Sequence, residues 1–250
     1  MNVTFLNGLF HFINFTIIAS IVYLFNNIKD YKSDKNNKKL RYKIDLKNIK
    51  NYYYFGIIIL STQLIILSIF EREMIGICII YFLISIGYNF YLKQKKYVDI
   101  MIISIFHMIR IYYGSLAFEI ELSFYFILFC LAIFLMISAN KRLSEIHKKY
   151  ENRPYEIKDK VILEIIQLFF AFFAILIFLL YSLDSSKNQF FINHFYIYFN
   201  FLIINLLIGN FIYSQKRKHQ DIIEFIYKNK INYFLVFLFL ITFFKNSILF

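Results

Sequence analysis

Long apolar runs separated by short charged segments constrain the fold of this chain more than any other feature. Of the 250 residues 60% are hydrophobic, yet the 28 basic and 16 acidic residues gather between the apolar runs instead of alternating with them. Such runs are typical of membrane-spanning helices, because a helix satisfies its own backbone hydrogen bonds in lipid. Eight are expected, at about residues 3–25, 52–70, 74–92, 98–117, 122–139, 161–183, 190–213 and 232–249. The sequence therefore predicts an all-α fold, a polytopic membrane helix bundle of about eight transmembrane helices.

Nothing in the sequence divides these runs into separate domains. There is no repeat of about 20 to 50 residues and no linker, so we expect a single transmembrane helical domain over residues 1–250. Its two longest polar segments, expected as loops, are 26–51 and 140–160. Cys78 and Cys130 fall inside predicted helices without a CxxC motif or a histidine partner. We expect them to be small apolar core residues and not a disulfide or a zinc site.

The basic residues lie almost entirely on one side of the predicted bundle. The first, third, fifth and seventh connections hold 24 Lys and Arg residues, whereas the opposite side holds only Arg72, Lys187 and Lys245. Because the positive side of a membrane protein is cytoplasmic, we expect both termini outside, in a bacterial plasma membrane. The net charge of +12 then lies on a face that attracts anionic lipids and phosphorylated substrates. Nucleic-acid binding is not expected, because these charges are not organised on a soluble domain.

Acidic and amide side chains follow the first apolar run. If the helix continues, Asn26, Asp30 and Asp34 recur every four residues and share one face. Two carboxylates one turn apart repel each other unless a cation lies between them, and Mg²⁺ completed by phosphate oxygens is the usual solution. A basic run from Lys35 to Lys43 follows and suits phosphate groups. A solvated helix end with many lysines is the structural alternative.

Arg110 lies inside the fourth apolar run, near the middle of the bilayer. A guanidinium at that depth is costly unless it faces a polar cavity, a carboxylate or a ligand phosphate. An ion pair with Asp99, Glu119 or Glu121, or snorkelling toward the interface, would be the structural alternatives. Gly114, four residues on and on the same face, would allow a neighbouring helix or a ligand to approach closely.

In order and spacing, these elements resemble the UbiA superfamily of intramembrane prenyltransferases. The run Asn26-Asn27-Ile28-Lys29-Asp30, followed by Asp34, is similar to the family's first motif, Asn-Asp-x-x-Asp-x-x-x-Asp. Further elements resemble the decaprenyl-phosphate phosphoribosyltransferase branch of that family. They are Tyr88 to Lys93, Val98-Asp99-Ile100, Arg110 with Gly114 and Ala117, Leu122-Ser123, and Lys141-Arg142-x-Ser144-Glu145. The resemblance covers about residues 12–183.

The resemblance implies both a fold and a reaction. Such proteins are UbiA-like helix bundles around a cavity open to lipid, with two motif segments capping it on the cytoplasmic side. This chain is expected to begin where the family's second helix begins. The implied reaction is the Mg²⁺-dependent transfer of 5-phosphoribose from phosphoribosyl diphosphate to a polyprenyl phosphate. The partners would then be these two substrates and the membrane, and a homo-oligomer is left open.

The resemblance also implies roles for individual residues. Asp30 and Asp34 would hold Mg²⁺, and Glu145 would act with them in catalysis. The residues expected to contact the substrates are Asn26, Asn27, Lys38, Lys39, Arg41, Arg110, Lys141 and Arg142. Lys93 and Asp99 are given no role beyond anchoring the ends of their helices.

Departures from the family pattern leave other functions open. Asn27 stands where the motif has its first aspartate, and an amide contributes no charge, so weaker metal binding is expected. A transferase that uses a prenyl diphosphate and another acceptor would be favoured by a second Asp-x-x-x-Asp motif, which residues 140–160 lack. The third alternative is a catalytically inactive relative that binds a polyprenyl lipid or a partner subunit, and Asn27 favours it.

Overall fold

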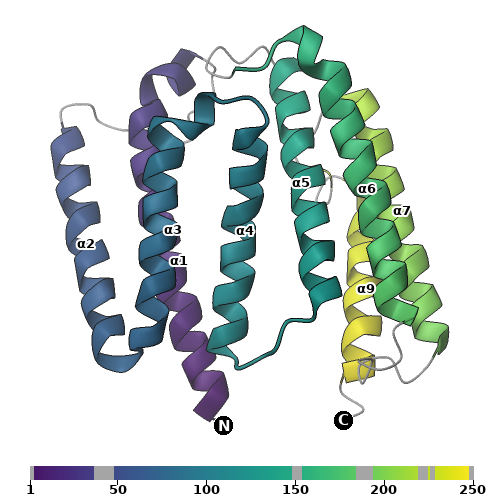
Figure 1. Ribbon diagram of the computed structural model, residues 1–250, viewed down its shortest axis with the longest axis horizontal. Coiled ribbons are helices and arrows are strands. Elements are labelled where there is room, and N and C mark those ends of the chain that lie inside the picture. The colour runs from purple at the N-terminus through teal and green to yellow at the C-terminus, as the bar shows by residue number, and fades with distance from the viewer. Residues whose placement is uncertain are drawn as a thin grey trace. The chain divides into compact units, whose positions relative to one another are not determined.

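The structure is a computed structural model that describes residues 3–36, 48–147, 154–183, 194–218, 225 and 229–247. These residues form eight α-helices and two short 3-10 helices and contain no strand. The α-helices are α1 (Val3–Asn36), α2 (Ile49–Phe70), α3 (Arg72–Phe90), α4 (Val98–Ala117), α5 (Phe124–His147), α6 (Lys160–Leu183), α7 (His194–Lys218) and α9 (Lys230–Ser247). The 3-10 helices are η2 (Leu92–Gln94) and η3 (Ile157–Asp159). The prediction of an all-α fold is confirmed, and each of the eight predicted spans overlaps a helix of the described chain (Figure 1).

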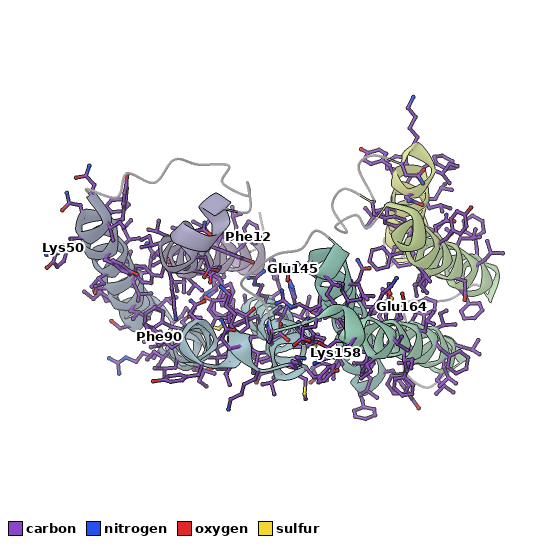
Figure 2. All side chains as sticks on the ribbon, turned by 90° about the horizontal axis from the view of Figure 1, so that it is seen from above. Phe12, Lys50, Phe90, Glu145, Lys158 and Glu164 are labelled. Carbon is purple, nitrogen blue, oxygen red and sulfur yellow. The ribbon has the colours of Figure 1, made fainter. Side chains whose placement is uncertain are left out.

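Six of the helices, α1 to α6, are long and apolar enough to cross a bilayer. The described apolar parts of α7 and α9 are shorter, at Phe199–Tyr213 and Lys230–Thr242. Large apolar side chains also lie on the outside of the helices, as Phe90 does at 62% exposure (Figure 2). An exposed apolar surface of this kind is what lipid would cover, as expected for a membrane helix bundle.

The two polar segments that were expected as loops are partly helical, and this expectation was wrong at their first residues. Helix α1 continues through residues 26–36, and α5 continues through residues 140–147. The polar residues there include neither glycine nor proline, so nothing in the backbone ends the helix where the apolar run ends. The first residues of both motifs are therefore held on helices.

The chain forms two compact units. The first unit comprises Met1–Leu122 with Tyr150–Pro154, and the second comprises Ser123–Lys149 with Tyr155–Phe250. The single domain over residues 1–250 stays a prediction.

Helices α1 to α4 build the first unit, with α1 in contact with each of the other three (Figure 1). Its core is apolar, and Ile18 and Leu67 are fully buried in it. Gly56 lets α2 approach α1, because a Cβ atom there would lie 2.6 Å from Cε1 of Phe25. The up-and-down order of the helices brings the end of α1, the start of α2, the end of α3 and the start of α4 to one end of the unit.

Helices α5, α6, α7 and α9 build the second unit. Helices α5 and α6 pack closely along their length, with the small residues Ala132, Ala171 and Ala174 buried in this unit's core. Helices α7 and α9 are joined by polar pairs, such as Thr242 Oγ1 donating to Asn200 Oδ1 at 2.6 Å. Buried hydrogen bonds of this kind hold helices together where lipid offers no hydrophobic driving force.

Candidate active site

Asp30, a predicted metal ligand, is ion-paired with Lys93 of η2. Both side chains are largely withdrawn from solvent, at 15% exposure for Asp30 and 7% for Lys93. Removing one partner of such a withdrawn pair is destabilising, because it leaves the other charge poorly compensated. The pair joins the end of α1 to the connection between α3 and α4, and it gives Lys93 a place in the site that the sequence did not predict.

Lys29 makes a second contact between the end of α1 and the region where α3 ends. Its Nζ donates a hydrogen bond to the backbone oxygen of Asn89 and lies 3.8 Å from the ring centroid of Phe90. An ammonium group over an aromatic face is stabilised by the ring quadrupole. Two successive residues of α1 therefore hold the predicted first motif against this region, Lys29 through the end of α3 and Asp30 through η2.

Oxygen atoms without hydrogen-bond partners lie at this end of the first unit. The side-chain oxygens Asn26 Oδ1 and Asn89 Oδ1 are buried and have no hydrogen-bond partner among the described residues. Asp99, in the first turn of α4, is fully buried. Buried polar atoms are nearly always satisfied, so unsatisfied ones call for an explanation. Amide and carboxylate oxygens are the ligands that Mg²⁺ prefers, and the residues present fit such a cation.

The backbone between α3 and α4 is strained at this place. Tyr97 has a φ of 65°, which is unusual for a residue with a side chain, and it directly precedes α4. The chain thereby reverses direction between Phe90 and Val98. The tight reversal keeps Lys93 and Asp99 at the same end of the unit as Asp30.

Arg110 points toward tyrosines rather than carboxylates. Its Nη2 donates to the hydroxyl oxygens of Tyr23 at 3.3 Å and Tyr81 at 3.0 Å. Its Nε is buried and has no hydrogen-bond partner in the described part of the chain. The alternative of an ion pair with nearby carboxylates does not hold among the described residues, where the hydroxyl groups are its hydrogen-bond partners. Within the described ranges the guanidinium is bound by hydroxyl groups and by no carboxylate, which suits a site for an anion.

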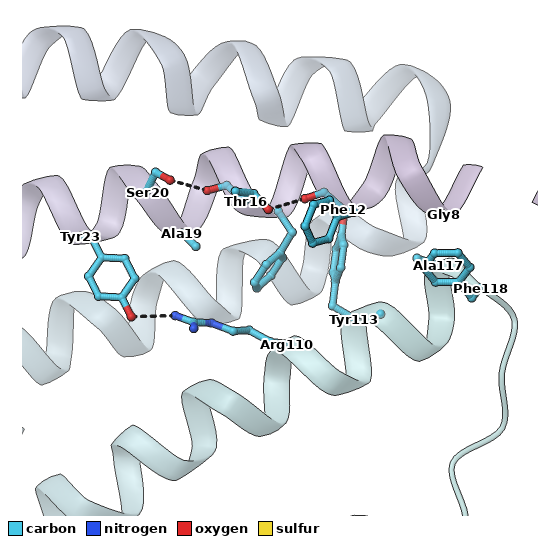
Figure 3. A pocket seen from close by; sticks show the side chains of 12 residues that line it. Gly8, Phe12, Thr16, Ala19, Ser20, Tyr23, Arg110, Tyr113, Ala117 and Phe118 are labelled. Atoms are coloured by element: carbon cyan, nitrogen blue, oxygen red, sulfur yellow. Dashed lines mark hydrogen bonds between the residues drawn. The ribbon is translucent and has the colours of Figure 1, made fainter. Parts of the chain in front are cut away.

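A cavity of about 380 Å³ lies between α1 and α4, and we refer to it as the α1–α4 groove (Figure 3). Twelve residues line it, all within the described ranges, and Arg110 is the charged one among them. Most of the others are apolar or small, including Phe12, Phe15, Ala19 and Gly114. An apolar cavity with one fixed polar group is the usual form of a small-molecule site.

The second motif lies in the last turns of α5, in the second unit. Arg142 Nη1 donates to Glu145 Oε2 at 2.5 Å, and the two side chains are 0% and 4% exposed. Lys141 is exposed. Arg142 and Glu145 therefore bind each other inside the unit, whereas Lys141 is the member of the motif that faces outward.

A neighbouring polar pair was not singled out from the sequence. Gln167 of α6 donates through Nε2 to Asn140 Oδ1 at 3.4 Å, and both residues are buried. Gln167, the one amide side chain within the largely apolar run 161–183, was the available signal. Three further residues at the first site were not predicted, because nothing in their sequence surroundings distinguishes them. They are Asn89, Tyr23 and Tyr81.

The other residues predicted for the site are either exposed or outside the described residues. Asn27 is exposed on α1. The side chain of Asp34 lies outside the described residues, as do Lys38, Lys39 and Arg41. In the part of the chain that is described, three or more His, Cys, Asp and Glu side chains are nowhere gathered as a metal site. Asp30 belongs to the first unit and Glu145 to the second, and their meeting in one site stays a prediction.

Comparison with known proteins supports a family for the chain. A model of the UbiA prenyltransferase family matches residues 2–158. The chain is 27% identical over 139 residues to a decaprenyl-phosphate phosphoribosyltransferase of Mycobacterium tuberculosis, which covers 54% of this chain and 46% of that protein. A protein of the same description from Mycolicibacterium smegmatis is also 27% identical, over 138 residues, covering 54% of this chain and 43% of the relative.

A third relative is an uncharacterised protein of Sinorhizobium fredii, 21% identical over 154 residues, which cover 60% of this chain and 30% of the relative. The matches thus span less than half the length of each of these curated relatives. The family match covers more than half of this chain and includes the first motif segment and residues 140–158 of the second. The protein therefore belongs to the UbiA prenyltransferase family, as an integral membrane protein with a likeness to its decaprenyl-phosphate phosphoribosyltransferase branch.

Proposed function

We propose that the protein transfers 5-phosphoribose from phosphoribosyl diphosphate to a polyprenyl phosphate in a reaction that depends on Mg²⁺. The observation that carries the proposal is the group at the end of α1, where a carboxylate is paired with a lysine beside buried, unsatisfied amide oxygens. Membership of a transferase family and the likeness to phosphoribosyltransferases support the choice of reaction.

In the proposed reaction, an oxygen of the lipid phosphate attacks the anomeric carbon of ribose. The bond from that carbon to the diphosphate breaks, and the diphosphate leaves with the electron pair. No proton has to move, so the site has to hold two anionic substrates and stabilise the leaving group. Fixed cationic groups in a site that excludes water suit this electrostatic task.

Residues of the first unit would bind the donor. Asp30 and Asp34 would hold Mg²⁺, with Asn26 supplying an amide oxygen. Lys93 would keep Asp30 in place before the donor binds. The metal, when bound, would neutralise the leaving diphosphate. The remaining cations of the first motif, Lys38, Lys39 and Arg41, would hold the diphosphate and the ribose phosphate.

The second motif would complete the site from α5. Lys141 is exposed and would contact the donor directly. Arg142 and Glu145 are hydrogen-bonded to each other and would fix the end of α5 so that Lys141 points toward the donor. The basic ends of the helices would face the cytoplasm, where phosphoribosyl diphosphate is available, in a bacterial plasma membrane.

The proposal is tested with the purified protein in lipid nanodiscs. With Mg²⁺, polyprenyl phosphate and labelled phosphoribosyl diphosphate, we expect labelled lipid to form. Removal of Mg²⁺ with EDTA should abolish its formation, because the carboxylates alone repel the diphosphate. An unlabelled lipid pool after prolonged incubation with Mg²⁺ would contradict the proposal. Labelled prenyl diphosphate, offered with aromatic acceptors, tests the alternative transferase reaction.

One observation favours a catalytically inactive relative as the second candidate. Asn27 is exposed on α1, next to the unsatisfied oxygen of Asn26, where the family's first motif has an aspartate. The Asn27→Asp variant separates the two candidates. If it forms labelled lipid and the natural sequence does not, the protein is an inactive binder of its lipid. If both are active, the variant should need less Mg²⁺, since a charge has been added to the metal site.

A further inference from the structure

The α1–α4 groove has one charged end and one apolar end. Arg110 and Tyr23 lie at one end, and Gly8 and Phe118 lie at the other (Figure 3). Tyr23 and Gly8 are fifteen residues apart on α1, which corresponds to about 22 Å along the helix. A Cβ atom on Gly8 would lie 2.1 Å from the ring of Phe118, so this close contact bounds the apolar end. The groove therefore has the shape of an elongated ligand with an anionic head and an apolar tail.

The charged end lies directly below the proposed donor site. Tyr23 precedes Asp30 by seven residues on α1, a rise of about 10 Å. An anion at Arg110 would thus be deeper in the bilayer than the Asp30 carboxylate, and on the side from which a lipid head would reach the donor. This depth suits the acceptor of the proposed reaction better than its donor, which enters from water.

Two tyrosines hold the Arg110 guanidinium in different ways. Tyr81 is 1% exposed and its ring packs edge-on against Phe15 and Phe106, so its hydroxyl group is fixed. Tyr23 lines the groove and is 53% exposed, so an incoming ligand oxygen can replace its hydroxyl group. The buried Nε of Arg110 is a further donor without a partner in the described chain. A guanidinium with donors to spare is suited to bind phosphate by more than one hydrogen bond.

The groove is open beside Arg110. No atom of the described chain lies within 4 Å of the place that a Cβ atom on Gly114 would occupy. The close approach of a neighbouring helix that the sequence allowed at this position is therefore absent among the described residues. The space beside Gly114 can therefore hold a ligand, the second possibility that the sequence allowed.

We propose that the α1–α4 groove binds the acceptor lipid and that Arg110 selects a phosphate head group over a neutral hydroxyl head group. Tyr81 and Tyr23 are the positioning residues that hold Arg110 in the groove. The inference rests on the proposed function for the identity of the acceptor, a polyprenyl phosphate. It adds the residue that distinguishes this lipid from the corresponding polyprenol. A neutral head group would make no charged hydrogen bond to Arg110, and the protein therefore prefers the phosphate head group.

Equilibrium binding of labelled farnesyl phosphate and farnesol to the protein in nanodiscs tests the inference. The natural sequence should bind farnesyl phosphate about 10- to 100-fold more tightly than farnesol, the range expected for charged hydrogen bonds. Arg110→Met should remove this preference, Arg110→Lys should keep part of it, and Arg72→Met, at the turn between α2 and α3, should leave it unchanged. If Arg110→Met keeps the full preference, the inference is overturned.

A second pair of variants tests the groove itself, in case Arg110→Met does not fold. Gly114→Leu should fill the groove and weaken binding of both probes about tenfold or more, since a branched side chain would occupy the ligand's place. Gly76→Leu is the matched control, because position 76 on α3 is equally open and does not line the groove. Equal binding by the two glycine variants would overturn the assignment of the groove.

Binding of phosphoribosyl diphosphate with Mg²⁺ separates this inference from the proposed function. Arg110→Met should leave donor binding within about twofold of the natural sequence. If the natural sequence binds no donor but keeps its preference for farnesyl phosphate, the proposed transfer fails and the lipid site stands. If donor binding is normal and the preference is absent, the lipid site fails and the transfer reaction is untouched.

Discussion

Replacing Asp30 with asparagine is expected to lower the rate of phosphoribosyl transfer by about a hundredfold or more. The substitution keeps the shape of the side chain and removes the charge that would hold Mg²⁺ beside the diphosphate. The substitution also removes the carboxylate that pairs with Lys93, which is withdrawn from solvent, and the loss of this ion pair would lower stability. Loss of activity in the single variant alone therefore does not separate chemistry from folding.

The double variant Asp30→Asn/Lys93→Met separates the two effects. Removing both charges removes the buried ammonium together with its carboxylate, so thermal unfolding in detergent should return toward that of the natural sequence. Transfer of labelled ribose phosphate should stay at the level of the single variant, because the metal ligand is still missing. Glu73→Gln, an exposed acid at the start of α3, is the matched control and should retain full activity. A double variant that regains both stability and activity would refute the role of Asp30 as a metal ligand.

The Arg142→Met variant is expected to lose about 3 to 5 kcal/mol of stability, the cost of breaking a buried ion pair by removing one partner. Glu145, whose side chain is 4% exposed, would lose the guanidinium of Arg142. The double variant Arg142→Met/Glu145→Met should recover most of this loss, because two apolar side chains replace the pair. Lys141→Met, on the exposed side of the same helix turn, should leave stability unchanged.

Activity distinguishes the roles within this motif. Lys141→Met should bind phosphoribosyl diphosphate about tenfold or more weakly, as expected for the loss of one charged hydrogen bond. The stable double variant should transfer ribose phosphate slowly if the pair positions Lys141. Full activity in that double variant would show that Arg142 and Glu145 serve the fold alone.

The transmembrane fold was predictable from the sequence because lipid imposes one requirement on every span. Each backbone polar group in the bilayer must be satisfied within its own helix, so a long apolar run has a single outcome. The turn between α2 and α3 was predicted at 71–73, where charge interrupts the apolar run, and in the structure it is shorter, with only Glu71 between the two helices. Hydropathy carries no such information beyond the bilayer. The helical extension at 140–147 was therefore not predicted, and the extension at 26–36 was considered only as a condition for placing Asn26, Asp30 and Asp34 on one face.

The candidate site was predictable only in part, because hydrogen bonds between distant residues leave no mark in a single sequence. The carboxylate at Asp30 stood out against its surroundings, whereas its partner Lys93 looked like one of many basic residues beside the membrane. Tyr23 and Tyr81 are two of 21 tyrosines, and only the structure shows that they hold Arg110. The structural alternative, an ion pair of Arg110 with a nearby carboxylate, does not hold among the described residues, because its side chain reaches Tyr23 of α1 and Tyr81 of α3.

The central claim is that the two motif segments, distant along the chain, form one site. It is tested by cross-linking cysteines placed at Asn27 and Lys141, both exposed, in a chain whose Cys78 and Cys130 are changed to alanine. A short bifunctional thiol reagent should join them, and phosphoribosyl diphosphate with Mg²⁺ should protect them. The control pair places cysteines at Asn27 and Phe124, and Phe124 lies about 25 Å from position 141 along α5. Efficient cross-linking of the first pair, blocked by the donor, is the predicted result, and cross-linking of the control pair instead would contradict the account.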